Sequence, residues 1–155
     1  MIKFRLEIHN AFTVCGKRTW ISGQDNSLFG RFWEECHADG TVDTLKSAAK
    51  PEITKAPTIG VSCVEKDPAD RAFDFLIAAE GAQIDNLERY QVPACTWAIF
   101  QNRGALPMAL VDAEMYAFSQ WLPQSGYVHA FAPELEVYPE DGSVEFWLPV
   151  MEEKQ

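Results

Sequence analysis

At 155 residues the chain is long enough for one domain with its own core, and its 47% hydrophobic and 23% charged residues are ordinary for a globular protein. A formal net charge of −10 argues against binding to nucleic acid or to an anionic membrane surface, because both require a basic patch. No apolar run approaches the roughly 20 residues of a membrane span, and the alternating, charged residues 1–7 do not resemble a signal peptide. We therefore expect a single cytoplasmic domain over residues 1–155.

The four cysteines, Cys15, Cys36, Cys63 and Cys95, are widely spaced and contain no C-x-x-C pair. This spacing does not favour a zinc site or a redox motif, so we expect free thiols in a reducing compartment. The three histidines have no common metal-ligand spacing either. The sequence therefore predicts neither a metal nor a cofactor.

The first half of the chain predicts two strands, a helix and two further strands. Their expected ranges are 4–8 and 12–20 for the first strands, 27–39 for the helix, and 58–64 and 72–79 for the last strands. Asn26 or Ser27 can cap the helix, and Gly40 follows its end. Residues 41–56 are expected to form a tail of helix and a long connection.

The second half repeats this order. Strand residues over 90–102, interrupted by Pro93, precede a helix expected over 107–122, whose apolar side chains recur at helical spacing and include Phe118. We expect this apolar stripe, Phe118 included, to pack into the core. Residues 134–150 then predict a β-hairpin around a Pro-Glu-Asp-Gly turn.

The repeated order predicts an α+β fold of tandem duplicated strand–helix–strand–strand units, covering about residues 1–82 and 83–155. One helix covers only one face of such an antiparallel unit. When two units join edge to edge, both helices lie on one side of the sheets and a concave face lies on the other. We expect a central ligand cleft there, because small-molecule sites are usually concave.

The last strand carries the most distinctive side-chain pattern in the chain. Val144, Phe146 and Leu148 point to one side, because side chains alternate along a strand. Glu145 and Trp147 therefore share the other side. That side is either a solvated face or the wall of a pocket for a ligand that is both cationic and aromatic. The alternation leaves both interpretations open.

Other candidate residues come from strands elsewhere in the chain. Trp97 lies on a predicted strand, and Phe73 and Phe75 share one face of another strand, where they would supply the opposite wall of the pocket. Glu134 and Glu136 alternate along the first strand of the last hairpin. Such alternation is typical of a solvated outer face, so we expect Glu134 to be exposed and outside the site.

Several segments resemble the GyrI-like effector-binding domains, a family that includes the drug-sensing halves of AraC- and MerR-type regulators. Residues 92–104 are similar to the family pattern IPAGxYAVF…G, residues 121–127 to WLPxSGY, residues 135–138 to FEVY, and residues 144–150 to VEIWIPI. Residues 12–18 and 32–35 are similar to the opening strand and first helix of the family. The likeness covers nearly the whole chain and is most specific from residue 92 to residue 150.

The resemblance implies a duplicated module with a central cleft. In multidrug-binding members a buried glutamate on the last strand meets lipophilic cations among aromatic rings, and Glu145 matches that position. The residues that we expect to bind the ligand are Glu145, Trp147, Trp97, Phe73, Phe75 and Glu136. The chain departs from the family at Cys95, where many members have glycine, and at Phe75, where tyrosine is common.

The expected function is that of a stand-alone module that binds amphipathic, cationic, aromatic small molecules. The chain has no helix-turn-helix pattern, so we expect no direct contact with nucleic acid. Two alternatives stay open, because the family also includes hydrolases of strained electrophiles and gyrase-modulating proteins. In a hydrolase Glu145 would act as the general acid or base. In a gyrase modulator the chain would bind a protein partner, which the sequence does not identify.

Overall fold

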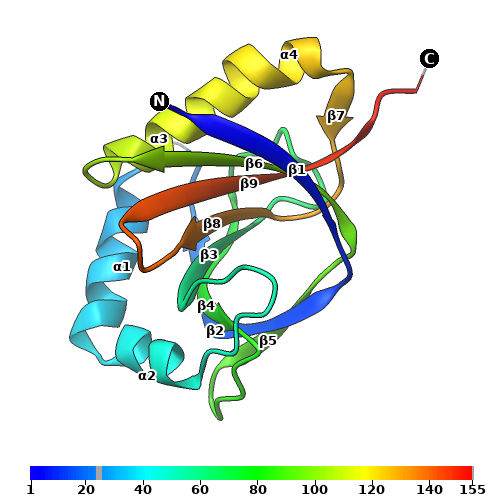
Figure 1. Cartoon of the computed structure of the whole chain (residues 1–155). Helices are drawn as coiled ribbons and strands as arrows, with labels where there is room; N and C mark the ends of the chain where they lie inside the picture. Colours follow the sequence, from blue (N-terminus) through cyan, green and yellow to red (C-terminus); the bar gives the residue numbers. More distant parts are fainter. Residues whose placement is uncertain (24–25, 155) are drawn as a thin grey trace.

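A nine-stranded antiparallel sheet forms the centre of this computed structural model, which describes residues 1–23 and 26–154 (Figure 1). The described strands are β1 Lys3–His9, β2 Phe12–Ile21, β3 Thr58–Cys63, β4 Phe73–Glu80, β5 Glu88–Val92, β6 Cys95–Arg103, β7 Tyr127–His129, β8 Glu134–Tyr138 and β9 Ser143–Glu152. The described helices are α1 Ser27–Ala38, α2 Thr41–Ala48, α3 Met108–Tyr116 and α4 Leu122–Ser125, and the π-helical turn η1 Ala117–Trp121 joins the last two.

The predicted strands, the two predicted helices and the last hairpin are confirmed. Residues 41–56 were predicted to form a tail of helix and a long connection, and the helical part is a separate helix, α2, rather than a continuation of α1. Gly40 adopts a left-handed φ of 84°, which ends α1 and lets the chain begin a second helix in a new direction. Val42 and Leu45, one turn apart, bury the inner face of α2.

The order of the strands shows the duplication. Along the sheet it is β1-β6-β9-β8-β3-β4-β2-β5, with β7 paired to β9. Counted from either edge, equivalent strands of the two halves take equivalent places, with β3 and β8 at the centre. The first strand of each half is exchanged, because β1 pairs with β6 and β5 pairs with β2.

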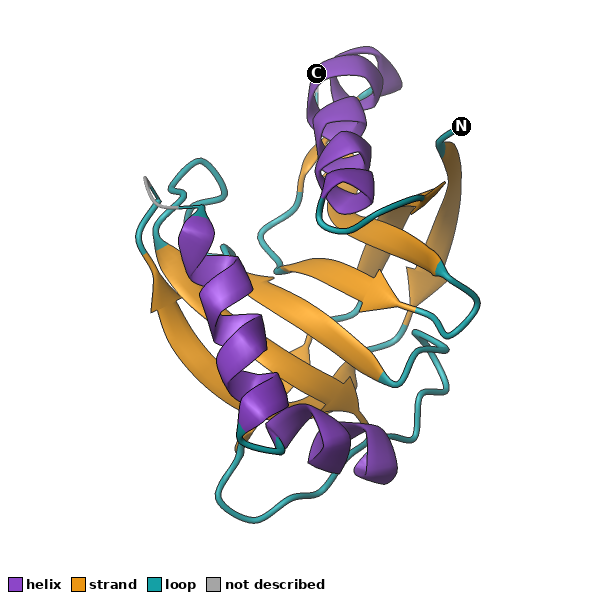
Figure 2. Ribbon diagram, turned by 90° about the vertical axis from the view of Figure 1, so that its left-hand side faces the viewer, coloured by secondary structure: helices purple, strands orange, loops and turns teal. Residues whose placement is uncertain are grey.

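All the helices lie on one face of the sheet, in two groups with strands between them (Figure 2). The first group, α1 and α2, packs on Phe75 and Ile77 of β4. The second group, α3 and η1, packs on Phe100 of β6 and Phe146 of β9. The strands β3 and β8 connect the two regions, since Gly60 lies opposite both Ile77 and Glu136. The predicted placement of both helices on one side is therefore confirmed.

The other face of the sheet closes over a core of its own. Val92 of β5, at one edge of the strand order, and Trp97 of β6, next to the opposite edge, belong to the same buried cluster. The sheet therefore curls around this core, which also holds Trp147, Leu135 and Val137. The centre of this face is filled by side chains, and β8, in the middle of the sheet, is covered on both faces.

Candidate functional site

The six residues predicted to bind a ligand lie on two opposite faces of the sheet. Glu145, Trp147 and Trp97 lie on the face turned away from the helices, and Phe73, Phe75 and Glu136 lie on the helix face. This follows from register: Glu145 is opposite Val137 of the inner core, whereas Glu136 is opposite Phe146 under the helices. Phe73 and Phe75 therefore do not form the wall opposite Trp147 that the sequence predicted.

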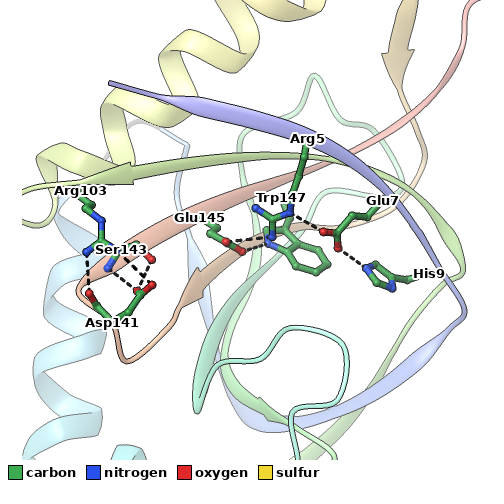
Figure 3. A network of polar contacts seen from close by, with 8 residues as sticks. All are labelled: Arg5, Glu7, His9, Arg103, Asp141, Ser143, Glu145 and Trp147. Carbon is green, nitrogen blue, oxygen red and sulfur yellow. Dashed lines mark hydrogen bonds and ion pairs between the residues drawn. The ribbon is translucent and has the colours of Figure 1, made fainter.

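Glu145 is buried, as predicted, with 6% of its surface exposed. It sits in a polar network that Figure 3 shows. Trp147 Nε1 donates a hydrogen bond of 2.9 Å to Glu145 Oε1, and Arg5 Nη2 lies 3.1 Å from Oε2. The Arg5 guanidinium also contacts Glu7 at 2.6 Å, and His9 lies 2.7 Å from the same carboxylate. The charge of Glu145 is thus already matched by a cation from β1.

A pocket of about 600 Å³ opens beside this network. Arg5, Glu7 and His9 of β1 form one wall, and Glu145 and Trp147 contribute to its lining. The His9 ring stacks on Trp147 with 5.6 Å between centroids. We call this cavity the rim pocket. Trp97 does not border it, because its indole is fully buried in the inner core.

Glu134 and Glu136 on β8 are buried, with 4% and 8% of their surface exposed, so the prediction of a solvated outer face is wrong. The alternation rule assumes that one face of an antiparallel sheet meets water. For β8 that assumption fails, because side chains from other parts of the chain, among them Arg71 and His129, lie over the face that carries these carboxylates. The sequence of the strand alone does not reveal this cover.

Glu134 is held by two basic side chains. Arg71 binds it through two parallel hydrogen bonds of 3.0 and 2.9 Å, and His129 Nε2 lies 2.8 Å from Oε2. Burial raises the pKa of Glu134, but the hydrogen bonds from His129 and Arg71 outweigh it, so the pKa lies below its usual value. Glu134 is therefore an ionised carboxylate with its partners in place.

Glu136 has a different environment. Its Oε1 accepts a hydrogen bond from the Tyr138 hydroxyl, and no basic side chain in the described part of the chain pairs with it. Burial, with a further effect from the charge of Glu134, raises the pKa of Glu136 to about 7. Burial likewise raises the pKa of Glu114 on α3 to about 8, helped by the charges of Glu136 and Glu134. Glu136 and Glu114 therefore both titrate near neutral pH, and the protonation of one affects the other.

Glycine at position 60 makes room for the carboxylate of Glu136. A Cβ atom there would lie 2.9 Å from Glu136 Oε1 and 2.8 Å from the ring of Phe75. Both groups therefore sit over the same bare stretch of β3, with the ring and the carboxylate close together. Phe29 of α1 packs against the other side of Phe75, with ring centroids 5.0 Å apart.

Aromatic rings from both halves of the chain surround these acids. Phe73 of β4 and Phe118 of η1 both lie against the Arg71 guanidinium, with Cζ 5.4 and 5.9 Å from their ring centroids. Trp33 of α1 packs edge-on against Tyr138 at 5.2 Å. We call Arg71, Phe73, Glu114, Phe118, Glu134 and Glu136 the acidic–aromatic cluster. It combines buried negative charge with ring faces, which suits an organic cation.

The sequence identified only part of this cluster. Phe73 and Glu136 were predicted as ligand residues, whereas Phe118 was assigned to core packing and Glu134 to solvent. Arg71 and Glu114 were not singled out. Arg71 comes from a turn and Glu114 from the flank of a helix, and neither stands in a local motif that points to a shared site.

The residues that the structure describes contain no group of His, Cys, Asp or Glu side chains arranged to hold a metal ion. None of their helices combines the length and the apolar character needed to cross a bilayer.

Comparison with known proteins gives one family and several structures with the same fold. The sequence matches the family model of the GyrI-like small molecule binding domain over residues 3–151. No curated protein sequence matches the chain.

Among solved structures, SAV2435 bound to tetraphenylphosphonium has a TM-score of 0.83 at 18% identity, covering 96% of this chain and 94% of that one. A protein from Staphylococcus aureus MU50 has a TM-score of 0.79 at 19% identity, covering 96% and 97%. The C-terminal domain of EcmrR has a TM-score of 0.63 at 16% identity, covering 99% of both chains. At these identities the likeness shows a common fold.

Proposed function

The chain belongs to the family of GyrI-like small-molecule-binding domains, and we propose that it binds lipophilic organic cations at the acidic–aromatic cluster, with Glu136 as the central carboxylate. The observation that carries this proposal is a buried carboxyl group without a basic partner in the described part of the chain, next to several aromatic rings. The binding of tetraphenylphosphonium by SAV2435 supports the choice of a lipophilic cation.

The physical argument concerns the cost of burying a charge. An ionised carboxylate in an apolar environment is unfavourable unless it is paired, which is why the pKa of Glu136 is raised. A bound cation removes that penalty and gains further stabilisation from the faces of neighbouring rings. Flat apolar walls and one charge impose little shape, so we expect broad specificity within this class.

Glu145 and the rim pocket form the competing location for the same function. The pocket has the space and an indole wall, but Glu145 is already paired with Arg5 and Trp147. A ligand cation would have to displace an arginine to reach the full charge of Glu145. For Glu136 it would have to displace only a hydroxyl hydrogen bond. We therefore place the ligand at Glu136.

A matched pair of substitutions tests this placement. Tetraphenylphosphonium is titrated calorimetrically into the wild-type protein, Glu136→Gln and Glu145→Gln. Both substitutions remove one buried charge from neighbouring strands and keep the side-chain shape. Glu136→Gln should weaken binding by roughly 1–3 kcal/mol, the scale of a charge-assisted contact, and Glu145→Gln should leave it nearly unchanged.

The other outcomes each have a distinct meaning. Weakening by Glu145→Gln alone would move the site to the rim pocket. Equal weakening by both variants would mean that only long-range charge acts on the ligand. Triphenylphosphine oxide, a neutral compound with the same rings, serves as the ligand control. If it binds as tightly as the cation, the proposed role of Glu136 is wrong.

A further inference from the structure

The acidic–aromatic cluster already contains a cation. The Arg71 guanidinium forms two hydrogen bonds with Glu134, of 3.0 and 2.9 Å, and lies against the rings of Phe73 and Phe118. Its three ligand groups come from β8, β4 and η1, which are far apart in sequence. This is the complete set of contacts that an aromatic cage offers to a bound organic cation.

Arg71 reaches the cluster from a turn. It lies between β3 and β4, just before Phe73, and Nη1 also donates a hydrogen bond of 3.1 Å to the carbonyl of Pro68 in the same turn. The side chain of Arg71 is 45% exposed, whereas that of Glu134 is 5% exposed. The cation is therefore open to solvent on one side, while its carboxylate lies beneath it. A competitor from solvent can therefore reach the pair, and one that forms the same two hydrogen bonds replaces Arg71 without leaving Glu134 unpaired.

We propose that Arg71 is an internal occupant of the ligand site, and that the ligand places a guanidinium or amidinium group on Glu134, Phe73 and Phe118 in its stead. This inference rests on the proposed function and names a ligand class for the same site. The planar fork of a guanidinium matches both oxygens of a carboxylate, which a spherical ammonium or a shielded phosphonium cannot do. An aryl group attached to the fork would extend toward Glu136 and the adjoining rings.

Competition between Arg71 and the ligand lowers the apparent affinity of the wild-type protein. While Arg71 occupies the cage, only the fraction of molecules with the arginine displaced is competent to bind. The apparent dissociation constant is then larger than the intrinsic one by the inverse of that fraction. Removal of the arginine side chain removes the competition, so the variant should bind more tightly than the wild type.

The experiment compares wild-type protein, Arg71→Ala and the control Arg18→Ala. Arg18 is also part-exposed and paired with two carboxylates, Glu88 and Asp74, but lies outside the cluster. Phenylguanidinium is titrated calorimetrically into each protein. Arg71→Ala should bind it about tenfold more tightly than the wild type, and Arg18→Ala should bind it like the wild type. Unchanged or weaker binding by Arg71→Ala would overturn the proposal.

A stability measurement covers the case in which Arg71→Ala folds poorly. Methylguanidinium chloride at low millimolar concentration should raise the melting temperature of Arg71→Ala by refilling the cage, with no such rise for Arg18→Ala. Tetramethylammonium chloride, which cannot form the two parallel hydrogen bonds, controls for salt. An equal response to both salts, or no response, would refute a guanidinium-shaped site.

Displacement also predicts a change in the turn itself. When phenylguanidinium saturates the wild-type protein, the amides of residues 69–71 should exchange hydrogen faster, because the turn is no longer held by the contacts of Arg71. Unchanged exchange in the saturated protein would show that the ligand does not displace Arg71. This result differs from failure of the proposed function, in which tetraphenylphosphonium would bind the wild type no more tightly than Glu136→Gln.

Discussion

Three buried glutamates on two neighbouring strands differ because their partners differ. Glu134 is ionised beside Arg71 and His129, Glu145 accepts hydrogen bonds from Arg5 and Trp147, and Glu136 has only the Tyr138 hydroxyl. Burial is similar for all three. The identity of the residues that reach them, rather than their depth, therefore decides which carboxyl group is left for a ligand.

The raised pKa of Glu136 predicts how stability changes with pH. Because the folded protein holds this proton more tightly than the unfolded chain, Glu136 favours the folded state at low pH. That contribution is lost as the pH rises from about 4.5 toward about 7. The glutamine in Glu136→Gln cannot ionise. The free energy of unfolding of this variant should therefore increase relative to that of the wild type as the pH rises over this interval.

Urea unfolding at a series of pH values measures this difference. A difference between wild type and Glu136→Gln that does not vary with pH would mean that the two states hold this proton equally.

At the scale of single elements, local patterns predicted most strands and the helical segments that contain α1 and α3, but not α2 as a separate helix. The hairpin at the end of the chain was predicted together with its apolar face, because Val144, Phe146 and Leu148 do pack under the helices. The burial of Glu145 was also predicted. Its pairing with Arg5 was not, since the two residues meet only through the packing of β1 onto β6 and of β6 onto β9.

The environment of β8 shows why the rest of the site could not be predicted. Whether Glu134 and Glu136 meet water depends on the place of β8 in the sheet and on helices that come from both halves of the chain. Alternation along five residues carries no information about either. The same holds for Arg71, which reaches Glu134 only because β3 and β8 are neighbours.

The close packing over β3 gives a prediction for this element. In Gly60→Ala the new methyl group would meet the Phe75 ring and Glu136 Oε1 at under 3.0 Å, so both must move. We expect a loss of about 1–3 kcal/mol in the free energy of unfolding, together with weaker binding of tetraphenylphosphonium. Chemical denaturation and calorimetry measure the two effects.

Gly30→Ala provides the comparison, because a methyl group on this residue of α1 meets no other atom within 4 Å. It should be neutral or slightly stabilising, as alanine is favoured over glycine in a helix. If Gly60→Ala is equally well tolerated, the contact between Phe75 and Glu136 is looser than the structure indicates.

At the scale of the whole molecule, the exchange of first strands ties the two halves together. Phe4 of β1 packs on Phe100 and Trp121, and Arg5 contacts Glu145, all in the second half of the chain. The N-terminal strand thus completes a site and a sheet edge that belong to the other half. The rim pocket depends on it directly, since β1 supplies one of its walls.

Deletion of residues 1–10 tests this dependence. The variant should unfold at a lower temperature, and it should tend to associate, because the loss of β1 leaves the edge of β6 unpaired. Thermal unfolding and light scattering measure both effects. Ile8→Ser, which alters an exposed side chain and keeps the strand, should behave like the wild type. A deletion variant that stays monomeric with an unchanged melting temperature would show that β1 is dispensable.

The position of β1 in the sheet also affects how the protein folds during its synthesis on the ribosome. In the finished sheet Lys3 stands opposite Gln101 and His9 opposite Cys95. Since β1 is synthesised before β6, it has no pairing partner until β6 has been made, whereas β2, β3 and β4 can already assemble with one another. During that interval the alternating residues of β1 are an unpaired strand in a crowded cell. The charged side chains of Lys3, Arg5 and Glu7 are suited to keep such a strand from pairing with the wrong chain.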